Sequence, residues 1–499
     1  MSTPPAAIGP TPPSTPPPGH LDRELIHGLA WTGAARWTAQ IVTWVATLLL
    51  ARLLTPQDFG IWAAAAVYQG IITLLSEFGV GASVVMLRDL DDDQIAQIYG
   101  FSLLLGLVSV IVSFAAATPL GWFYDSAPLP RIIIALSSLF LITSLRTVPV
   151  ALLQRERRFK SLALVDTAKA LVQSAALLTF AFLGFRFWTF VLGAVAAELV
   201  HTLLILRLRR HAIAWPRLGS IRAAMSFSID VVIARLSWYL YSNADVMIGL
   251  RVLGESLLGA YNMAWTLASV PVEKVSSLVV NVTPAFFSAL QKDAAEMRRY
   301  VTNLSGGIAM ITYPAAIGIA LVAPDFVPVA LGPGWDAAIL PLQILALYTT
   351  VRAITPILTP VLNAVGETRF AMRNNLLALA IMPVAFIAGS RYGPGGLAGA
   401  WLIAHPIIVV LLCRRAFRRI DLRAFTYLRS LAPAIGGCIA MAGAVLLVRL
   451  AGADLAQPFR LALDVAAGAL TYTGYLFAFH RDRIASLRRL AALARRRPD

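Results

Sequence analysis

The sequence predicts an all-α polytopic membrane protein, with about 14 transmembrane helices in two pseudo-symmetric bundles around a central cavity. Three observations support this fold class: the composition, the length of the apolar runs, and an internal repeat. Of the 499 residues, 58% are hydrophobic and 14% are charged, with a mean hydropathy of +0.73. Soluble domains are about 45–50% apolar and about a quarter charged, so this composition indicates a membrane protein.

The apolar residues form runs of roughly 20–27 residues, the length that an α-helix needs to cross a bilayer. Transmembrane β-strands would be about ten residues long and would alternate in polarity, which these runs do not. We therefore expect helical spans near residues 29–53, 60–86, 98–119, 131–153, 163–183, 187–206, 225–250, 259–287, 303–323, 339–363, 375–390, 397–413, 430–448 and 461–479.

The order of these spans gives the expected organisation of the chain. The start of the chain is rich in proline and has no apolar segment of the signal-peptide kind, so we expect a disordered arm there. The expected parts are this cytoplasmic arm (1–22), an N-terminal six-helix bundle (23–210), a cytoplasmic linker (211–224), a second six-helix bundle (225–413), a basic cytoplasmic loop (414–429), two extra C-terminal helices (430–480) and a basic cytoplasmic tail (481–499).

The distribution of positive charge predicts the orientation. Of the 42 Lys and Arg residues, six fall inside the expected spans and seven in the loops on one side, which leaves 29 on the other. Cytoplasmic loops are the ones enriched in Lys and Arg, so we expect both termini to be cytoplasmic. The net charge of +16 is then a topology signal with affinity for anionic membrane lipids, and nucleic acid is not an expected partner.

A repeat relates the two bundles. A shift of 199 residues lays Ala35-Arg36 on Ala234-Arg235, Arg52 on Arg251, and Gly60 on Gly259. Two bundles with matching first hairpins indicate a duplicated transporter with a cavity between its halves, although similar helix ends could also recur without a repeat.

Polar stripes mark the expected walls of this cavity. Arg36, Gln40, Thr43 and Thr47 share one face of the first helix, and Arg235 and Tyr239 occupy the corresponding face of the seventh. Hydrogen bonding between packed helices is the alternative explanation for such stripes.

Charged residues within the spans are the candidate functional groups, because each costs free energy in the membrane unless water, a counter-ion or a ligand offsets it. The candidates for substrate binding are Arg36, Arg146, Lys169, Arg235, Lys274, Arg352, Gln40 and Tyr239. The candidates for ion coupling are Glu77, Asp166, Asp245 and Glu273, each of which could instead be a structural counter-ion.

Motifs for catalysis are absent from the sequence. It contains no GxxxxGK[ST] loop, HExxH, CxxC or GxSxG, and its histidines form no ligand cluster. We therefore expect no enzyme, no cofactor and no metal site.

Three stretches carry a family resemblance: ARLLTPQDFGIWA at 51–63, LGPGWDAAILPLQILAL at 331–347 and LNAVGETR at 362–369. With them, the chain resembles the polysaccharide transporter (Wzx-type lipid-linked oligosaccharide flippase) family of the multidrug/oligosaccharidyl-lipid/polysaccharide (MOP) flippase superfamily. The resemblance implies a MATE-like fold in the bacterial inner membrane.

The resemblance also implies a function. Such a protein translocates undecaprenyl-diphosphate-linked oligosaccharides by alternating access, without ATP, for exopolysaccharide, capsule or O-antigen synthesis. A polysaccharide polymerase and co-polymerase are then candidate partners. The alternatives are a MATE-like multidrug or cation antiporter, a polymerase or ligase, and a non-transport component of a polysaccharide assembly complex. Arginine suits a diphosphate because its planar guanidinium offers paired charge-assisted donors.

Overall fold

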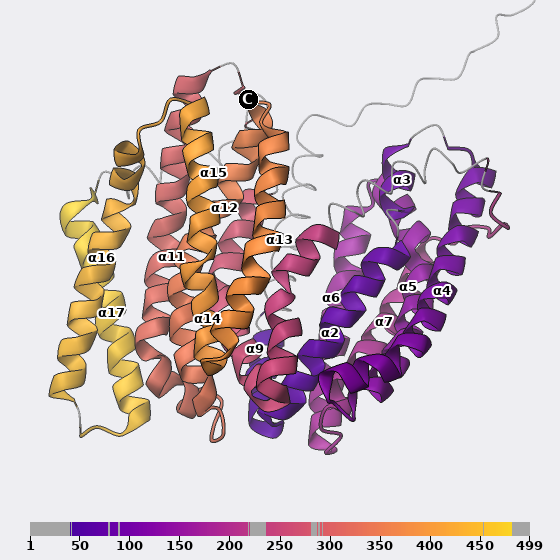
Figure 1. Ribbon diagram of the computed structural model, residues 1–499, viewed down its shortest axis with the longest axis horizontal. Helices are drawn as coiled ribbons and strands as arrows, with labels where there is room; N and C mark the ends of the chain where they lie inside the picture. The colour runs from indigo at the N-terminus through magenta and orange to yellow at the C-terminus, as the bar shows by residue number, and fades with distance from the viewer. Residues whose placement is uncertain are drawn as a thin grey trace, which may run out of the picture.

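A computed structural model describes residues 40, 42–77, 80–87, 90–217, 219, 236–280, 287, 290–291, 293–452 and 454–481. Within these ranges the chain is helical and contains no strand. Two groups of helices lie side by side, the first from the N-terminal half and the second from the C-terminal half (Figure 1). The predicted all-α membrane fold is confirmed.

Within the described residues, the N-terminal half contains one short helix and six further helices. The short helix is Val42–Leu53. It is followed by α2 (Pro56–Glu77), α3 (Val80–Met86), α4 (Asp92–Tyr124), α5 (Leu129–Arg155), α6 (Phe159–Phe182) and α7 (Trp188–Leu208). Along the chain, α4 packs against α5, and α6 packs against α7.

A long broken helix lies near the start of the described part of the C-terminal half. This helix, α9 (Ala244–Val280), is interrupted at Gly254. Its φ is 77°, a backbone conformation that glycine adopts at little energetic cost. It is followed by α11 (Ala294–Ala330), η1 (Asp336–Ala338), α12 (Ile339–Ala364), α13 (Thr368–Ser390), α14 (Gly393–Ile403), α15 (His405–Arg419), α16 (Ala424–Ala451) and α17 (Gln457–Phe479).

The helix lengths agree with a multi-pass membrane protein. Ten described segments are long and apolar enough to cross a membrane, with α14 and α15 counted together as Gly393–Arg419, and Val42–Leu53 is a shorter apolar helix. The span predicted at 375–390 is longer in the structure, where α13 has 23 residues. Its first turns carry polar residues such as Arg373 and Asn374, which hid this part of the helix from a hydropathy criterion.

The tight break at Thr55–Asp58 has a local cause. One carboxylate oxygen of the buried Asp58 accepts hydrogen bonds from the backbone N–H and the hydroxyl of Thr55, at 3.0 and 2.7 Å. Pro56 opens α2, where its missing N–H leaves no helical hydrogen bond unmade. The chain can therefore reverse between two apolar helices within a few residues.

The two halves meet where α2 and α9 cross. A Cβ atom added to Gly60 would lie 1.8 Å from the carbonyl oxygen of Glu255, and one added to Gly259 would lie 1.7 Å from that of Pro56. The contact is reciprocal, and both pairs obey the 199-residue shift. The two helices can approach this closely only because both positions are glycine.

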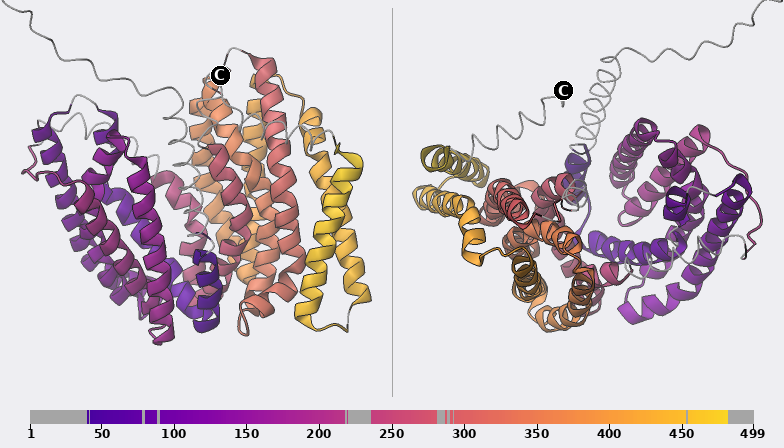
Figure 2. Two further views of the ribbon diagram at one scale, coloured as in Figure 1. Left: turned by 180° about the vertical axis from the view of Figure 1, so that it is seen from behind. Right: turned by 90° about the horizontal axis from the view of Figure 1, so that it is seen from above.

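Polar contacts surround this crossing. The Glu255 carboxylate accepts hydrogen bonds from Gln57 at 2.7 Å and from Ser126 at 2.5 Å. Trp335 donates its indole N–H to the carbonyl of Ala51 at 2.8 Å. We call this end of the molecule the closed end. Toward the opposite end the ribbons of the two halves diverge (Figure 2).

An ion-pair cluster attaches the last two helices, which lie at the outer edge of the C-terminal half (Figure 1). Asp325 of α11 and Asp464 of α17 are both buried. Arg449 of α16 contacts Asp325 at 3.0 Å and Asp464 at 2.7 Å, and Arg460 also contacts Asp325. The two arginines balance the two acids, so the cluster holds α16 and α17 against α11 without net charge.

Candidate functional site

Three adjoining cavities lie near the interface of the two halves. One of about 560 Å³ lies between the Val42–Leu53 helix, α9 and α11. A second, of about 380 Å³, shares Thr43, Thr47 and Thr266 with the first and extends toward α6 and α7. The third, of about 650 Å³, lies within the C-terminal half and shares Trp265 with the first. Shared lining residues make these cavities neighbours along one path.

The predicted polar stripe of the first helix lines the first of these cavities. Gln40, Thr43 and Thr47 line it from one half. Thr266, Ser269 and Glu273 line it from α9 of the other half. Two helices far apart in sequence therefore present polar faces to one space.

Arg352 on α12 lines the 650 Å³ cavity. Its guanidinium donates a hydrogen bond to the hydroxyl of Ser269 at 2.9 Å and lies 3.9 Å from the carboxylate of Glu273. It also lies 5.3 Å from the ring centroid of Trp265, in cation–π range. About a third of the side chain is exposed, so N–H donors remain available to a ligand.

Charge is sparse along this path. Among the described residues that line the three cavities, Arg352 and Glu273 are the only Arg, Lys, Asp or Glu side chains. Tyr239, predicted to bind substrate, lines the 650 Å³ cavity, and its hydroxyl lies 3.3 Å from the carbonyl oxygen of Val67 in α2. It therefore also links the two halves.

Several predicted residues lie beyond what the structure describes. Arg36 and Arg235 lie outside the described residues. Glu77 lies in α2 and Lys274 in α9, but their side chains lie outside the described part of the structure. The role of these four residues stays a prediction.

Arg146 and Lys169 lie in an ion-pair network inside the N-terminal half. Both contact the carboxylate of Glu198 on α7, Arg146 at 3.0 Å and Lys169 at 2.5 Å. The imidazole of His201 bridges Glu198, at 3.7 Å, and Asp166, at 3.3 Å. This geometry favours the structural alternative for the two cations, because both pair with Glu198 of the same bundle.

Asp245 is a buried acid without such a partner. Its carboxylate accepts hydrogen bonds from the hydroxyl of Tyr261 at 2.5 Å and from the indole N–H of Trp401 at 3.0 Å. Among the described residues, no Lys, Arg or His lies within 4 Å of it. The described groups that contact this carboxylate are therefore neutral hydrogen-bond donors, and its role in ion coupling stays a prediction.

The sequence interpretation missed the aromatic wall of the largest of the three cavities. Trp265, Tyr348 and Trp401 come from α9, α12 and α14, and their ring centroids lie 5.1 to 6.1 Å apart. A sequence signal existed, because Tyr348 and Arg352, and Trp401 and His405, are each four residues apart and so share a helix face. That spacing alone does not say which faces meet.

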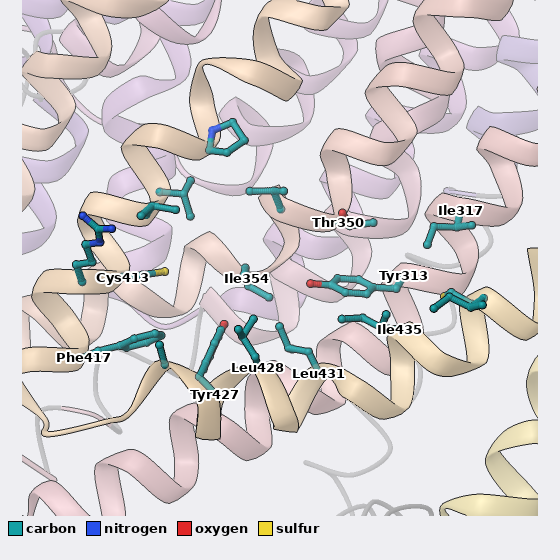
Figure 3. Close-up of a pocket in the computed structure, with 18 of the residues that line it drawn as sticks. Tyr313, Ile317, Thr350, Ile354, Cys413, Phe417, Tyr427, Leu428, Leu431 and Ile435 are labelled. Carbon is teal, nitrogen blue, oxygen red and sulfur yellow. The ribbon is translucent and has the colours of Figure 1, made fainter.

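An apolar groove lies behind this cavity. It has a volume of about 690 Å³ and lies between α11, α12, α15 and α16, with Arg414 on its lining. Figure 3 shows Tyr313, Ile354, Leu431 and Ile435 pointing toward one another across it. Val409 lines both this groove and the 650 Å³ cavity, so an apolar path and a polar space adjoin.

Comparisons with known proteins agree with this arrangement. Residues 49–340 match the profile of a family described as polysaccharide biosynthesis protein. The chain is 24% identical over 400 residues to the lipopolysaccharide biosynthesis protein WzxC of Escherichia coli (strain K12), covering 78% of this chain and 80% of that protein. It is 23% identical over 459 residues to the teichuronic acid biosynthesis protein TuaB of Bacillus subtilis (strain 168), covering 91% and 95%.

Solved structures share the fold. The lipid II flippase MurJ in an inward closed conformation matches with a TM-score of 0.70 at 14% identity, covering 91% of this chain and 100% of that one. An inward-facing multidrug resistance MATE family transporter of the MOP superfamily matches with a TM-score of 0.62 at 15% identity, covering 77% and 94%. The predicted MATE-like arrangement is confirmed at the level of the fold.

Proposed function

Because the chain belongs to the family of polysaccharide biosynthesis proteins, we propose that it is a flippase for undecaprenyl-diphosphate-linked oligosaccharide repeat units. The observation that carries the proposal is the adjoining pair of spaces in the C-terminal half. The 650 Å³ cavity has polar and aromatic walls with Arg352, and the groove beside it is apolar. A lipid-linked sugar needs both, a polar space for its headgroup and an apolar surface for its polyprenyl chain.

The diphosphate is the part of the substrate that requires positive charge. Arg352 contributes one guanidinium near the middle of the path, with donors that face the cavity. Arg36 and Arg235, which correspond in the repeat, are expected to add two more. Charge-assisted hydrogen bonds are worth about 1.5–3 kcal/mol each, roughly a ten- to hundredfold effect on affinity.

The arrangement of the halves supports alternating access. The structure is closed where Gly60 and Gly259 meet, and the ribbons diverge toward the other end (Figure 2). We place the closed end outside, because this puts the Arg-rich segments at 155–160 and 414–419 in the cytoplasm. The chain then lies in the bacterial inner membrane with both termini cytoplasmic, and the end where the ribbons diverge faces the leaflet where the substrate is made.

A coupling ion would drive the cycle, and Asp245 is the carboxylate best placed to carry it. It is buried among neutral donors, whereas Asp166 contacts His201 and Glu273 lies near Arg352. On the outer side, the released sugar would pass to a polysaccharide polymerase and co-polymerase. A MATE-like drug antiporter is the competing function, and the named relatives in polysaccharide synthesis disfavour it.

Translocation by the purified protein tests the proposal. Proteoliposomes that hold the chain should move undecaprenyl-diphosphate-linked oligosaccharide between leaflets, and protein-free liposomes should not. Arg36→Gln, Arg235→Gln and Arg352→Gln should each strongly reduce translocation per molecule of folded protein. Lys at these positions should restore only part, because it keeps the charge and loses the planar fork. Normal translocation by all three Gln variants at normal abundance would exclude the phosphate assignment.

A further inference from the structure

The 650 Å³ cavity has an aromatic platform on one side. The ring centroids of Trp265 and Trp401 lie 5.1 Å apart, and those of Tyr348 and Trp401 lie 5.3 Å apart. Tyr348 and Trp401 are almost fully buried, whereas Trp265 is only partly buried and lines two cavities. The two buried rings therefore support Trp265, whose ring is accessible from the cavity.

Two polar side chains that line this cavity are nearly buried, Asn374 at 6% and His405 at 7% exposed. The Nδ1 atom of His405 has no partner in the described part of the chain, whereas buried donors and acceptors are usually paired, because an unmade hydrogen bond costs free energy. The amide of Asn374 and the imidazole of His405 offer hydrogen-bonding groups to a ligand that carries hydroxyl groups.

The charge of the cavity lining restricts which ligands it can bind. Arg352 is the only Arg, Lys, Asp or Glu side chain among the described residues that line this cavity. Its guanidinium lies over the Trp265 ring, 5.3 Å from the ring centroid and in cation–π range. A phosphate bound by Arg352 would therefore bring the group bonded to it beside the aromatic platform.

We propose that this cavity is a saccharide subsite for an uncharged pyranose, the sugar bonded directly to the diphosphate. The inference rests on the proposed function and adds the substrate class to it. A pyranose has an apolar C–H face and a rim of hydroxyl groups. The face packs on Trp265, whose ring carries partial negative charge above its plane. The rim reaches Asn374 and His405, whose amide and imidazole can both donate and accept.

Asp245 is a positioning residue for this platform. Its carboxylate accepts the indole N–H of Trp401 at 3.0 Å and the hydroxyl of Tyr261 at 2.5 Å. Asp245 does not itself line the cavity. The acid that we propose for ion coupling thus contacts Trp401, one of the rings that support Trp265. A change in the protonation of Asp245 can therefore shift the aromatic platform of the subsite.

Binding of two lipids to the purified protein in nanodiscs tests the subsite. The probes are undecaprenyl diphosphate and undecaprenyl-diphosphate-glucose, and the readout is Kd by thermophoresis. The wild type should bind the glucosylated lipid about tenfold more tightly, from one stacking contact and the new hydrogen bonds. Trp265→Leu should lose this preference while its Kd for undecaprenyl diphosphate stays within about threefold. Trp265→Phe should keep most of the preference, because it keeps an aromatic face.

Trp122→Leu is the matched control, because Trp122 is 80% exposed at the end of α4 and lies on none of these cavities. It should bind both lipids as the wild type does. A Trp265→Leu variant that keeps the tenfold preference would overturn the subsite, as would a wild type that binds both lipids equally. A wild type that binds neither lipid and moves no oligosaccharide would instead overturn the proposed function.

Discussion

Gly60 of α2 and Gly259 of α9 each contact the backbone of the opposite helix where α2 and α9 cross. Each lies where a side chain would collide with the partner helix, at 1.8 Å from the carbonyl oxygen of Glu255 and 1.7 Å from that of Pro56. A shift of 199 residues relates Gly60 to Gly259 and also relates Pro56 to Glu255. The closed end is therefore a reciprocal contact between equivalent positions of the two repeats.

Gly259→Ala should open this end. The added methyl group has no room while α2 and α9 remain in contact, so the halves must separate or shift. Spin labels at Asp125→Cys and Tyr392→Cys, with Cys413 and Cys438 replaced by Ala, should report a longer or broader distance than in the parent. Gly318→Ala is the control, because a Cβ atom there meets nothing within 4 Å. An unchanged distance distribution in the Gly259 variant would contradict the proposed gate.

Asp245→Asn should remove ion coupling. The amide keeps an oxygen for the Tyr261 and Trp401 donors and loses the titratable group. In proteoliposomes with an imposed pH gradient, wild-type translocation should respond to the gradient and the variant should not. Glu273→Gln should retain the response, because its carboxylate is exposed. If the Asp245 variant responds to the gradient like the wild type, coupling depends on another residue. If wild-type translocation responds to neither a proton nor a sodium gradient, transport is not coupled to these ions.

Glu198→Gln should destabilise the N-terminal half. It leaves Arg146 and Lys169 without their shared carboxylate, and removing one partner of a buried ion pair costs about 3–5 kcal/mol. These side chains are 14–28% exposed, so we expect about 2 kcal/mol here. The measurement is thermal unfolding in detergent. Adding Lys169→Met to the Glu198→Gln variant removes one of the two unpaired positive charges, so it should recover part of the lost stability. If the variant unfolds like the wild type but loses translocation, Arg146 and Lys169 act on substrate instead.

Thiol labelling should confirm the orientation. Arg157 and Arg418 are exposed and belong to Arg-rich segments expected in the cytoplasm, whereas Tyr392 is 84% exposed at the closed end. In a background without native cysteines, an impermeant maleimide should label Tyr392→Cys in intact cells. Arg157→Cys and Arg418→Cys should react only after the membrane is permeabilised. The reverse pattern would invert the topology and place the closed end inside.

The loop before α13 should make stability depend on pH. Partial burial favours the neutral form of Glu367, but hydrogen bonds from Arg415 and Arg419 outweigh it and lower the pKa of Glu367 below its usual 4.5. A lowered folded-state pKa contributes stability above pH 4.5 and loses it as the pH falls through the folded-state value. Glu367→Gln should therefore lower the Tm at pH 7, with a smaller difference at pH 3.5. An equal difference at both pH values would contradict this.

The sequence by itself determined the class of fold and the position of most helices. Apolar runs long enough to cross a bilayer leave the backbone little choice but to bond within helices, so spans such as 131–153 and 461–479 could be predicted from composition alone. The repeat also placed Gly60 and Gly259 in equivalent positions. The polar stripe of Gln40, Thr43 and Thr47 was correctly expected to face a cavity, because helical periodicity fixes which residues share a face.

Only the tertiary structure decided which of these faces meet. Arg146 and Arg352 are both intramembrane arginines, yet Arg146 pairs with Glu198 inside one bundle and Arg352 faces a cavity. Trp265, Tyr348 and Trp401 are spread over 137 residues and form one platform only when α9, α12 and α14 pack together. Hydropathy determines that each helix lies in the membrane, but it says little about which helices pack against one another. Partner choice there depends on close packing and on pairing of polar groups, which are properties of the assembled bundle.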